Sequence, residues 1–200
     1  MSVFKIGELN AVLIHIPKTG GTSLRKGVFS DVDGPYYGPV PSKFLDLFKF
    51  AFVREPITRF LSCVSMFKYG TVDKNGAIRR RGSDTFNVDA AIEILKTPGL
   101  NYGQNRRSFS EKFLHHALPM SHPFNSIVDA DCIYRFESFE QDYIQICKRC
   151  DIQPIPALPK LHISRQQISP QSLTDQQILF LLKYYEQDYA DFDYNKKLYW

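Results

Sequence analysis

The stretch from residue 15 to residue 23 carries the clearest chemical signal in the sequence and reads His-Ile-Pro-Lys-Thr-Gly-Gly-Thr-Ser. It follows the apolar run 11–14, so a strand is expected to lead into a turn that contains glycines, hydroxyl groups and one lysine. Such a turn directs backbone N–H groups and the N-terminus of the next helix at one point, where an anion is stabilised. The sequence therefore predicts an anion-binding turn, with a phosphate group as the expected ligand.

The residue types in this turn suit that chemistry. The two glycines let the backbone approach a ligand without steric clash, the lysine brings a mobile positive charge, and the hydroxyl groups act as donors. Thr22 or Ser23 is expected to cap the following helix. The alternative is a tight strand-to-helix connection in which the polar residues bind nothing. The residues assigned to phosphate binding are Lys18, Thr19, Gly20, Gly21, Thr22 and Ser23.

This turn differs from the Walker A loop of conventional ATP and GTP hydrolases. In that loop a glycine is followed by four residues of any type and then by Gly-Lys-Ser or Gly-Lys-Thr. Here Val12 stands where the first glycine belongs, and both glycines follow Lys18. Asp129 is only a weak candidate for binding magnesium. A conventional nucleotide hydrolase is therefore disfavoured.

A second group of polar residues follows the apolar run 48–53. Arg54 leaves the end of this expected strand, where its planar guanidinium can bind an oxyanion through two hydrogen bonds. Arg59 and Ser62 lie three residues apart in the helix expected next, so they share one face. These residues predict a second anion pocket at the same sheet edge, and two pockets imply a ligand with two separated phosphate groups.

Hydrophobic periodicity predicts a single domain, residues 1–200, of the α/β class. We expect three layers, with a mainly parallel central sheet flanked by helices and a P-loop-like phosphate-binding turn. Loops are expected at 31–41 and 70–84, and a Ser172/Asp175 pair resembles a capping box. Strands are expected at 10–16, 48–53, 127–128 and 132–136, and helices at 22–30, 42–47, 56–68, 88–95, 110–116, 138–151 and 173–188.

The composition favours a soluble enzyme or binding protein with an anionic ligand. The chain has 200 residues, a net charge of +4, 44% hydrophobic and 23% charged residues, and no apolar run approaching the length of a membrane span. We expect a cytoplasmic protein that does not bind nucleic acid, because aromatic residues are not interleaved with the basic ones. The arginine clusters at 79–81 and 106–107 either bind an acidic acceptor or are solvated. Cys147 and Cys150 are expected to be structural.

The two polar turns together resemble those of the sulfotransferases that use 3′-phosphoadenosine-5′-phosphosulfate (PAPS), especially the carbohydrate group with heparan 2-O- and chondroitin 4-sulfotransferases and bacterial relatives. Further similar segments are 133–140 and the Tyr-x-x-Asp-Tyr-x-x-Phe pattern within 185–194. The resemblance implies that residues 18–23 hold the 5′-phosphosulfate and that Arg54 and Ser62 hold the 3′-phosphate. It also implies transfer to a hydroxyl, with a carbohydrate as the expected acceptor, and release of adenosine 3′,5′-bisphosphate (PAP).

The resemblance further implies a catalytic role for Lys18, which would steady the bridging oxygen as the sulfuryl group leaves, without a metal. A general base is also needed, and relatives carry a histidine in the loop between the two motifs, where this chain has none at 36–40. His116 is the leading substitute and Glu55 another option. Two alternatives remain open: a binding protein that has lost catalysis, and an ATP-dependent small-molecule kinase.

Overall fold

The computed structural model describes residues 2–72, 76–158, 163–164 and 166–196. The chain forms two compact units, and each unit is built from two separate stretches of sequence. The first unit contains residues 1–54 and 120–161, and the second contains residues 55–119 and 162–200. The expectation of a single domain over residues 1–200 stays a prediction.

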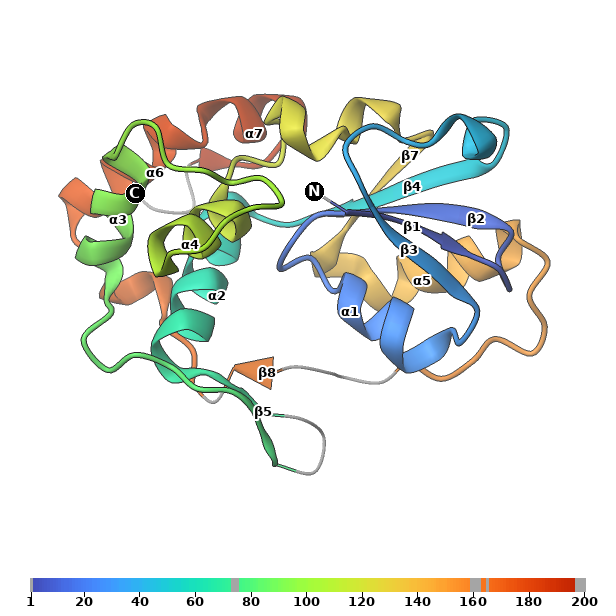
Figure 1. Ribbon diagram of the computed structural model, residues 1–200, viewed down its shortest axis with the longest axis horizontal. Coiled ribbons are helices and arrows are strands. Elements are labelled where there is room, and N and C mark those ends of the chain that lie inside the picture. Colours follow the sequence, from blue (N-terminus) through green and yellow to red (C-terminus); the bar gives the residue numbers. More distant parts are fainter. Residues whose placement is uncertain (1, 73–75, 159–162, 165, 197–200) are drawn as a thin grey trace. The chain divides into compact units, whose positions relative to one another are not determined.

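The first unit is built on a five-stranded sheet with the strand order β3-β1-β2-β4-β7. The central strand β2 pairs in parallel with β4, and β4 pairs in parallel with β7, whereas β1 is antiparallel to both of its neighbours. The strands, seen in Figure 1, are β1 (Ser2–Ile6), β2 (Ala11–His15), β3 (Val32–Tyr37), β4 (Phe48–Val53) and β7 (Cys132–Arg135).

Helices cover one face of this sheet. Leu13 of β2 and Phe50 and Phe52 of β4 pack against α5 (Phe139–Arg149) and against the π-helical segment η1 (Leu24–Val28), which continues the short helix α1 (Gly21–Ser23). The Phe52 and Phe139 rings lie 4.6 Å apart. Figure 1 shows α1 and α5 on the same side of the strands. Val12 and Ile14, which alternate with Leu13 and so point to the other face, are also fully buried. β2 therefore has no polar face, which explains its continuous apolar run.

The structure confirms a mixed α/β arrangement with a central sheet flanked by helices, but it corrects the expectation of a mainly parallel sheet. Two of the four strand pairings are antiparallel, because β1 and β3 add to the edge of the sheet. The expected loop at 31–41 contains β3, which is an edge strand with mostly exposed residues. Its composition, including Pro35, gives no alternating pattern, and proline is tolerated at an edge where its missing N–H is not needed.

The second unit is mainly helical, and its core surrounds α2 (Pro56–Tyr69). Phe60, Val64 and Phe67 of α2 are fully buried against the other helices and against the C-terminal residues Tyr185 and Tyr189. The other helices are α3 (Val88–Lys96), α4 (Phe109–Ala117), α6 (Asp175–Tyr184) and α7 (Glu186–Asp191). The bounds of α3 and α4 agree closely with the expected helices at 88–95 and 110–116, whereas the single helix expected at 173–188 is two helices, α6 and α7.

A small antiparallel sheet has the order β6-β5-β8, with β5 and β6 in the expected loop after α2 and β8 in the later part of the chain. Its strands are β5 (Thr71–Val72), β6 (Ile78–Arg80) and β8 (Ile163–Ser164). Short 3-10 helices complete the described chain: η2 (Ser42–Phe44), η3 (Pro123–Asn125), η4 (Ile127–Asp129), η5 (Phe136–Ser138) and η6 (Pro170–Ser172).

Two local predictions are corrected. Residues 127–128, expected in a strand, belong to η4. The capping box of the last long helix is formed by Thr174 and Gln177, not by Ser172 and Asp175. Ser172 lies instead in η6, where its hydroxyl donates to the Ser169 carbonyl. Across the described helices, no segment is both long and apolar enough to cross a membrane.

Candidate functional site

The turn after β2 brings the chain from the sheet into α1 through two left-handed residues. Lys18 has a φ of 71° and Gly20 a φ of 87°. Gly20 is also the N-cap of α1, and no side chain caps this helix. This corrects the expectation that Thr22 or Ser23 caps it, since both residues lie inside the first turn. Their hydroxyl groups are therefore on a half-buried helix start and not committed to capping.

The hydroxyl of Thr19 has a structural role in this turn. Thr19 is 1% exposed, and its Oγ1 donates to the Ile16 carbonyl oxygen at 2.8 Å. The hydrogen bond closes the turn onto the last residues of β2. In this conformation Thr19 can offer a ligand its backbone N–H but not its side chain.

Packing requires both glycines of the turn. A Cβ atom on Gly20 would lie 2.7 Å from the Phe139 ring, and one on Gly21 would overlap the His15 imidazole. Gly20 also needs the left-handed conformation that side chains disfavour. The glycines thus let the turn pack closely on α5 and on the end of β2, a reason for their presence that is independent of any ligand.

Arg54 brings the second polar turn beside the first. β2 and β4 are parallel neighbours, so their carboxyl ends lie at the same edge of the sheet. The Arg54 Nη1 atom donates to the Lys18 carbonyl oxygen at 3.4 Å, and its Cζ atom lies 4.5 Å from the centre of the Phe136 ring. The structure therefore joins Lys18, the glycine turn and Arg54 in one place within the first unit.

The other predicted site residues, Ser62 and His116, belong to the second unit. Ser62 is half-buried in the second turn of α2. At the start of α2 the Glu55 carboxylate is the N-cap and accepts from the backbone N–H groups of Ile57 (3.2 Å) and Thr58 (2.7 Å). Glu55 is 6% exposed and also accepts from the Tyr189 hydroxyl. We therefore assign Glu55 to capping α2 and no longer consider it for the general base.

Arg59 is the residue of this segment whose role differs most from expectation. It is 1% exposed, and its guanidinium donates to the carbonyl oxygens of His116 (3.0 Å) and Leu118. A cation at these carbonyls also complements the negative end of α4. The helix face expected to carry both Arg59 and Ser62 is therefore buried at Arg59. The positive charge of Arg59 stabilises the C-terminal end of α4.

His116 lies in the last turn of α4, and a contact with the preceding turn positions its ring. The Nδ1 atom is 2.8 Å from the Lys112 carbonyl oxygen. A neutral imidazole makes this contact with a protonated Nδ1, which leaves Nε2 as the atom able to accept a proton. Ser108 and Glu111 form a capping box at the other end of α4.

The neighbouring histidine, His115, is in a more buried environment than His116. His115 is buried, and its Nδ1 atom lies 2.7 Å from the Tyr102 carbonyl oxygen. Burial lowers the pKa of His115 to about 4, so the ring is neutral at pH 7. Of this pair, His116 is the residue suited to exchange a proton with a ligand.

The remaining histidines and the cysteine pair have structural surroundings. The His15 ring packs edge-on against Phe4, and the His122 side chain accepts from the Phe124 backbone at the start of η3. Burial raises the pKa of the Cys147 and Cys150 thiols, which disfavours the reactive thiolate form. His162 lies outside the described residues.

The sequence reasoning missed the roles of two tyrosines in the pattern at 185–194. Tyr185 donates its hydroxyl to the Ala117 carbonyl oxygen at 2.6 Å, and Tyr189 donates to Glu55. Tyr185, Asp188, Tyr189 and Phe192 are all buried. Their i, i+3, i+4 and i+7 spacing marked a buried helical face, but their partners are distant in sequence.

Comparison with known proteins identifies the family. A model of the sulfotransferase family matches residues 40–195, which include Arg54, Ser62 and His116 and begin after the turn at 15–23. No curated protein and no solved structure matches the chain significantly. Because the matched region covers most of the sequence, the protein belongs to the sulfotransferase family.

Proposed function

We propose that the protein transfers a sulfuryl group from PAPS to a hydroxyl group, and that the acceptor is a carbohydrate. Family membership supports sulfuryl transfer in general. The observation that carries the choice of donor is the contact between Arg54 and the Lys18 carbonyl oxygen. Two clusters of anion-binding groups at one sheet edge suit a nucleotide with phosphate groups at both ends of its ribose.

The residues of the first unit fit the donor, with one change from the sequence assignment. The Lys18 ammonium, the backbone N–H groups of Gly20 and Gly21, and the hydroxyls of Thr22 and Ser23 are assigned to the 5′-phosphosulfate. Thr19 contributes through its backbone, because its hydroxyl is bonded to Ile16. Arg54 is assigned to the 3′-phosphate. Ser62, which the sequence also assigns to this phosphate, lies in the second unit, and its role stays a prediction. The turn thus has a P-loop-like role without the Walker A sequence.

The proposed reaction needs one base and one cation. The donor, when bound, supplies a sulfuryl group on a phosphate–sulfate anhydride. His116 Nε2 takes the proton of the acceptor hydroxyl. At the same time the hydroxyl oxygen bonds to sulfur, and the bond between sulfur and the bridging oxygen of PAPS breaks. Lys18 stabilises the charge that develops on the departing phosphate, and PAP is released. A cytoplasmic location remains part of this proposal.

The direct test combines the protein with PAPS and a panel of neutral and acidic oligosaccharides. PAP formation is followed by chromatography, and binding of PAP and of adenosine 5′-monophosphate is compared by calorimetry. We expect PAP release with at least one acceptor and tighter binding of PAP than of the monophosphate. Equal affinities together with no release would reject the proposal. Tight PAP binding without release would indicate a binding protein that lacks catalysis.

Substitution of Lys18 distinguishes an effect on the chemical step from an effect on donor binding. Because the charge on the leaving phosphate is larger in the transition state, Lys18→Ala should lower kcat by roughly a hundredfold or more and weaken PAP binding much less. Rapid-quench measurement of PAP release gives kcat, and calorimetry gives the affinity. Equal losses in both would contradict a transition-state role for this lysine.

A further inference from the structure

Arg80, at the end of β6, is a half-buried cation whose position is set by the backbone around it. It pairs with Thr71 in the small sheet of the second unit. Just beyond it, Ser83 donates its N–H to the Phe67 carbonyl oxygen at 2.9 Å. A Cβ atom on Gly70 would overlap the Arg80 carbonyl oxygen, so the chain passes here in direct backbone contact. These backbone contacts therefore hold Arg80 against the C-terminal end of α2.

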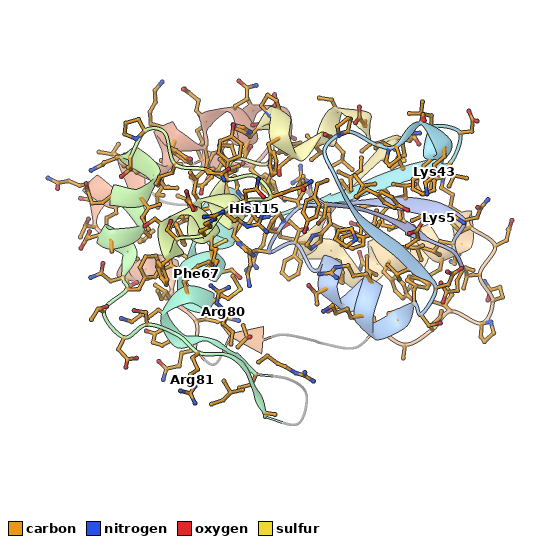
Figure 2. All side chains as sticks on the ribbon, viewed as in Figure 1. Lys5, Lys43, Phe67, Arg80, Arg81 and His115 are labelled. Atoms are coloured by element: carbon orange, nitrogen blue, oxygen red, sulfur yellow. The ribbon has the colours of Figure 1, made fainter. Side chains whose placement is uncertain are left out.

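The Arg80 side chain lies flat on an aromatic ring. Its Cζ atom is 3.9 Å from the centre of the Phe67 ring, a stacking contact that leaves the edges of the guanidinium available as donors. Figure 2 shows the labelled Arg80 and Phe67 side chains close together, with Arg81 further along the hairpin. Burial lowers the pKa of Arg80 from its ordinary value, and an arginine remains charged despite such a shift.

This charge has no carboxylate within ion-pair distance among the described residues, where the ion pairs join Lys43, Lys49, Lys96 and Lys183 to acidic side chains. A half-buried guanidinium without a counter-ion has lost solvation, and no described carboxylate compensates Arg80 for that loss. An oxyanion bound from outside would supply both the charge and the hydrogen bonds that this group lacks.

The same aromatic ring connects Arg80 with His116. The His116 imidazole meets the Phe67 ring edge-on, with 5.6 Å between the ring centres. Cys63, one helical turn before Phe67, also contacts His116, because its Sγ donates to the His116 carbonyl oxygen at 3.2 Å. Arg80 and His116 therefore contact the same aromatic ring, one through its guanidinium and the other through its imidazole.

We propose that Arg80 binds an anionic substituent of the acceptor, a carboxylate or a sulfate ester located close to the hydroxyl that is sulfated. Arg80 is then a specificity-determining residue, which selects acidic over neutral acceptors. This inference rests on the proposed function, because it takes His116 as the site of the acceptor hydroxyl. Stacking on Phe67 orients the guanidinium for the two-point contact that either oxyanion allows.

The test compares Arg80→Met with Arg81→Met. Methionine keeps apolar contact with the Phe67 ring and removes the charge, and Arg81 is the exposed neighbour whose replacement removes the same charge. The probes are three forms of a chondroitin hexasaccharide: the unsulfated form with its carboxylates, the carboxyl-reduced neutral form, and a sulfated form of the carboxyl-reduced chain. Binding is measured by calorimetry in the presence of PAP.

The wild-type protein should bind at least one anionic form more tightly than the neutral form, by roughly tenfold or more. Arg80→Met should remove that preference and leave the affinities for PAP and for the neutral form within about twofold. Arg81→Met should have little effect. The anionic form that loses most affinity identifies the group as a carboxylate or a sulfate ester.

Three results would overturn the proposal: wild-type protein without any anionic preference, equal effects of the two variants, or weakened PAP binding in Arg80→Met, which would place Arg80 in the donor site. Melting followed by circular dichroism checks that the variants fold, and Arg80→Lys provides a second, charged variant that should retain part of the preference. These binding measurements need no turnover. A failure of the wild-type protein to transfer a sulfuryl group would therefore be distinguished from a failure of Arg80 to bind an anionic group.

Discussion

Arg54 and His116 are the residues on which the proposed chemistry depends most, and they have different kinds of support. Arg54 lies beside the Lys18 turn because two parallel strands end at the same edge of the sheet. His116 is suited to proton transfer because one ring nitrogen is held by a helix carbonyl, whereas His115 next to it is buried and neutral. Each role predicts its own pattern of losses on substitution.

Arg54→Ala should weaken PAP binding by about 1.5–3 kcal/mol, the scale of a hydrogen bond to a charged group. Binding of adenosine 5′-monophosphate should change little, because it lacks the 3′-phosphate. Calorimetry with both nucleotides measures the difference. An unchanged dissociation constant for PAP would remove Arg54 from the donor site.

His116→Ala should reduce kcat by roughly 10²–10⁴-fold, the usual contribution of a positioned general base, without a matching loss of PAP affinity. His122→Ala is a suitable control, because this histidine accepts a backbone hydrogen bond at the start of η3. PAP release under saturating PAPS measures the effect. Equal activity of the two variants would exclude His116 as the base.

At the scale of elements, α4 is held firmly at both ends. Ser108 and Glu111 cap its N-terminus. At its C-terminus, three consecutive carbonyl oxygens accept side-chain donors: Arg59 reaches the first and third, and the Tyr185 hydroxyl reaches Ala117 between them. This arrangement satisfies groups that a helix end leaves without partners. The helix that carries His116 is therefore fixed by residues from α2 and from the C-terminal part of the chain.

Tyr185→Phe should lower the free energy of unfolding by about 1–3 kcal/mol, because it leaves the buried Ala117 carbonyl oxygen without this donor. Tyr184→Phe is the matched control, since its hydroxyl makes no hydrogen bond within the described part of the chain, and it should stay within about 0.5 kcal/mol of wild type. Urea unfolding followed by tyrosine fluorescence compares them. Similar effects of the two substitutions would refute the capping role of Tyr185.

At the scale of the whole molecule, two units are each assembled from two stretches of sequence. The five-stranded sheet carries the Lys18 turn and Arg54, and the helical unit carries Ser62, His116 and Arg80. The proposed donor and acceptor groups are thus divided between the units. Global stability is therefore expected to depend on buried groups in both of them.

His115 gives this stability a defined pH dependence. Its pKa in the folded protein is about 4, below the ordinary value of 6.5, so the unfolded chain binds a proton that the folded chain does not. This contribution is fully present above pH 6.5 and is lost as the pH falls towards 4. His115→Gln should flatten that part of the stability curve, measured by urea unfolding at several pH values. An equally steep curve in the variant would contradict the assignment.

Sequence patterns predict those helices and strands whose buried residues form a regular apolar pattern. β2, β4 and α2 were found because their apolar residues form continuous or helical patterns. The segment that forms β3 predicts a loop, because an exposed edge strand buries neither face regularly. The sequence predicts the start of α6 too early, because two capping signals occur two residues apart and the first, at Ser172, lies inside η6.

The site was predictable where residue type and strand ends determine it, and not where distant contacts do. Lys18 and Arg54 follow directly from strand ends, and the structure places them in contact. The burial of Arg59 depends on carbonyl groups 57 and 59 residues further along the chain. The hydroxyl of Thr19 turns inward because the Ile16 carbonyl accepts it, a choice that a hydroxyl-rich motif does not reveal.

The divided course of the chain has a consequence for biosynthesis. Phe60, Phe67 and Phe113 emerge from the ribosome well before Leu181, Tyr185 and Tyr189, which complete their shared core. At roughly 5–20 residues per second, these large aromatic side chains wait several seconds for their partners. Newly made chains should therefore engage chaperones that bind exposed aromatic segments, and a ribosome that stalls after residue 160 would leave the helical unit with an open core.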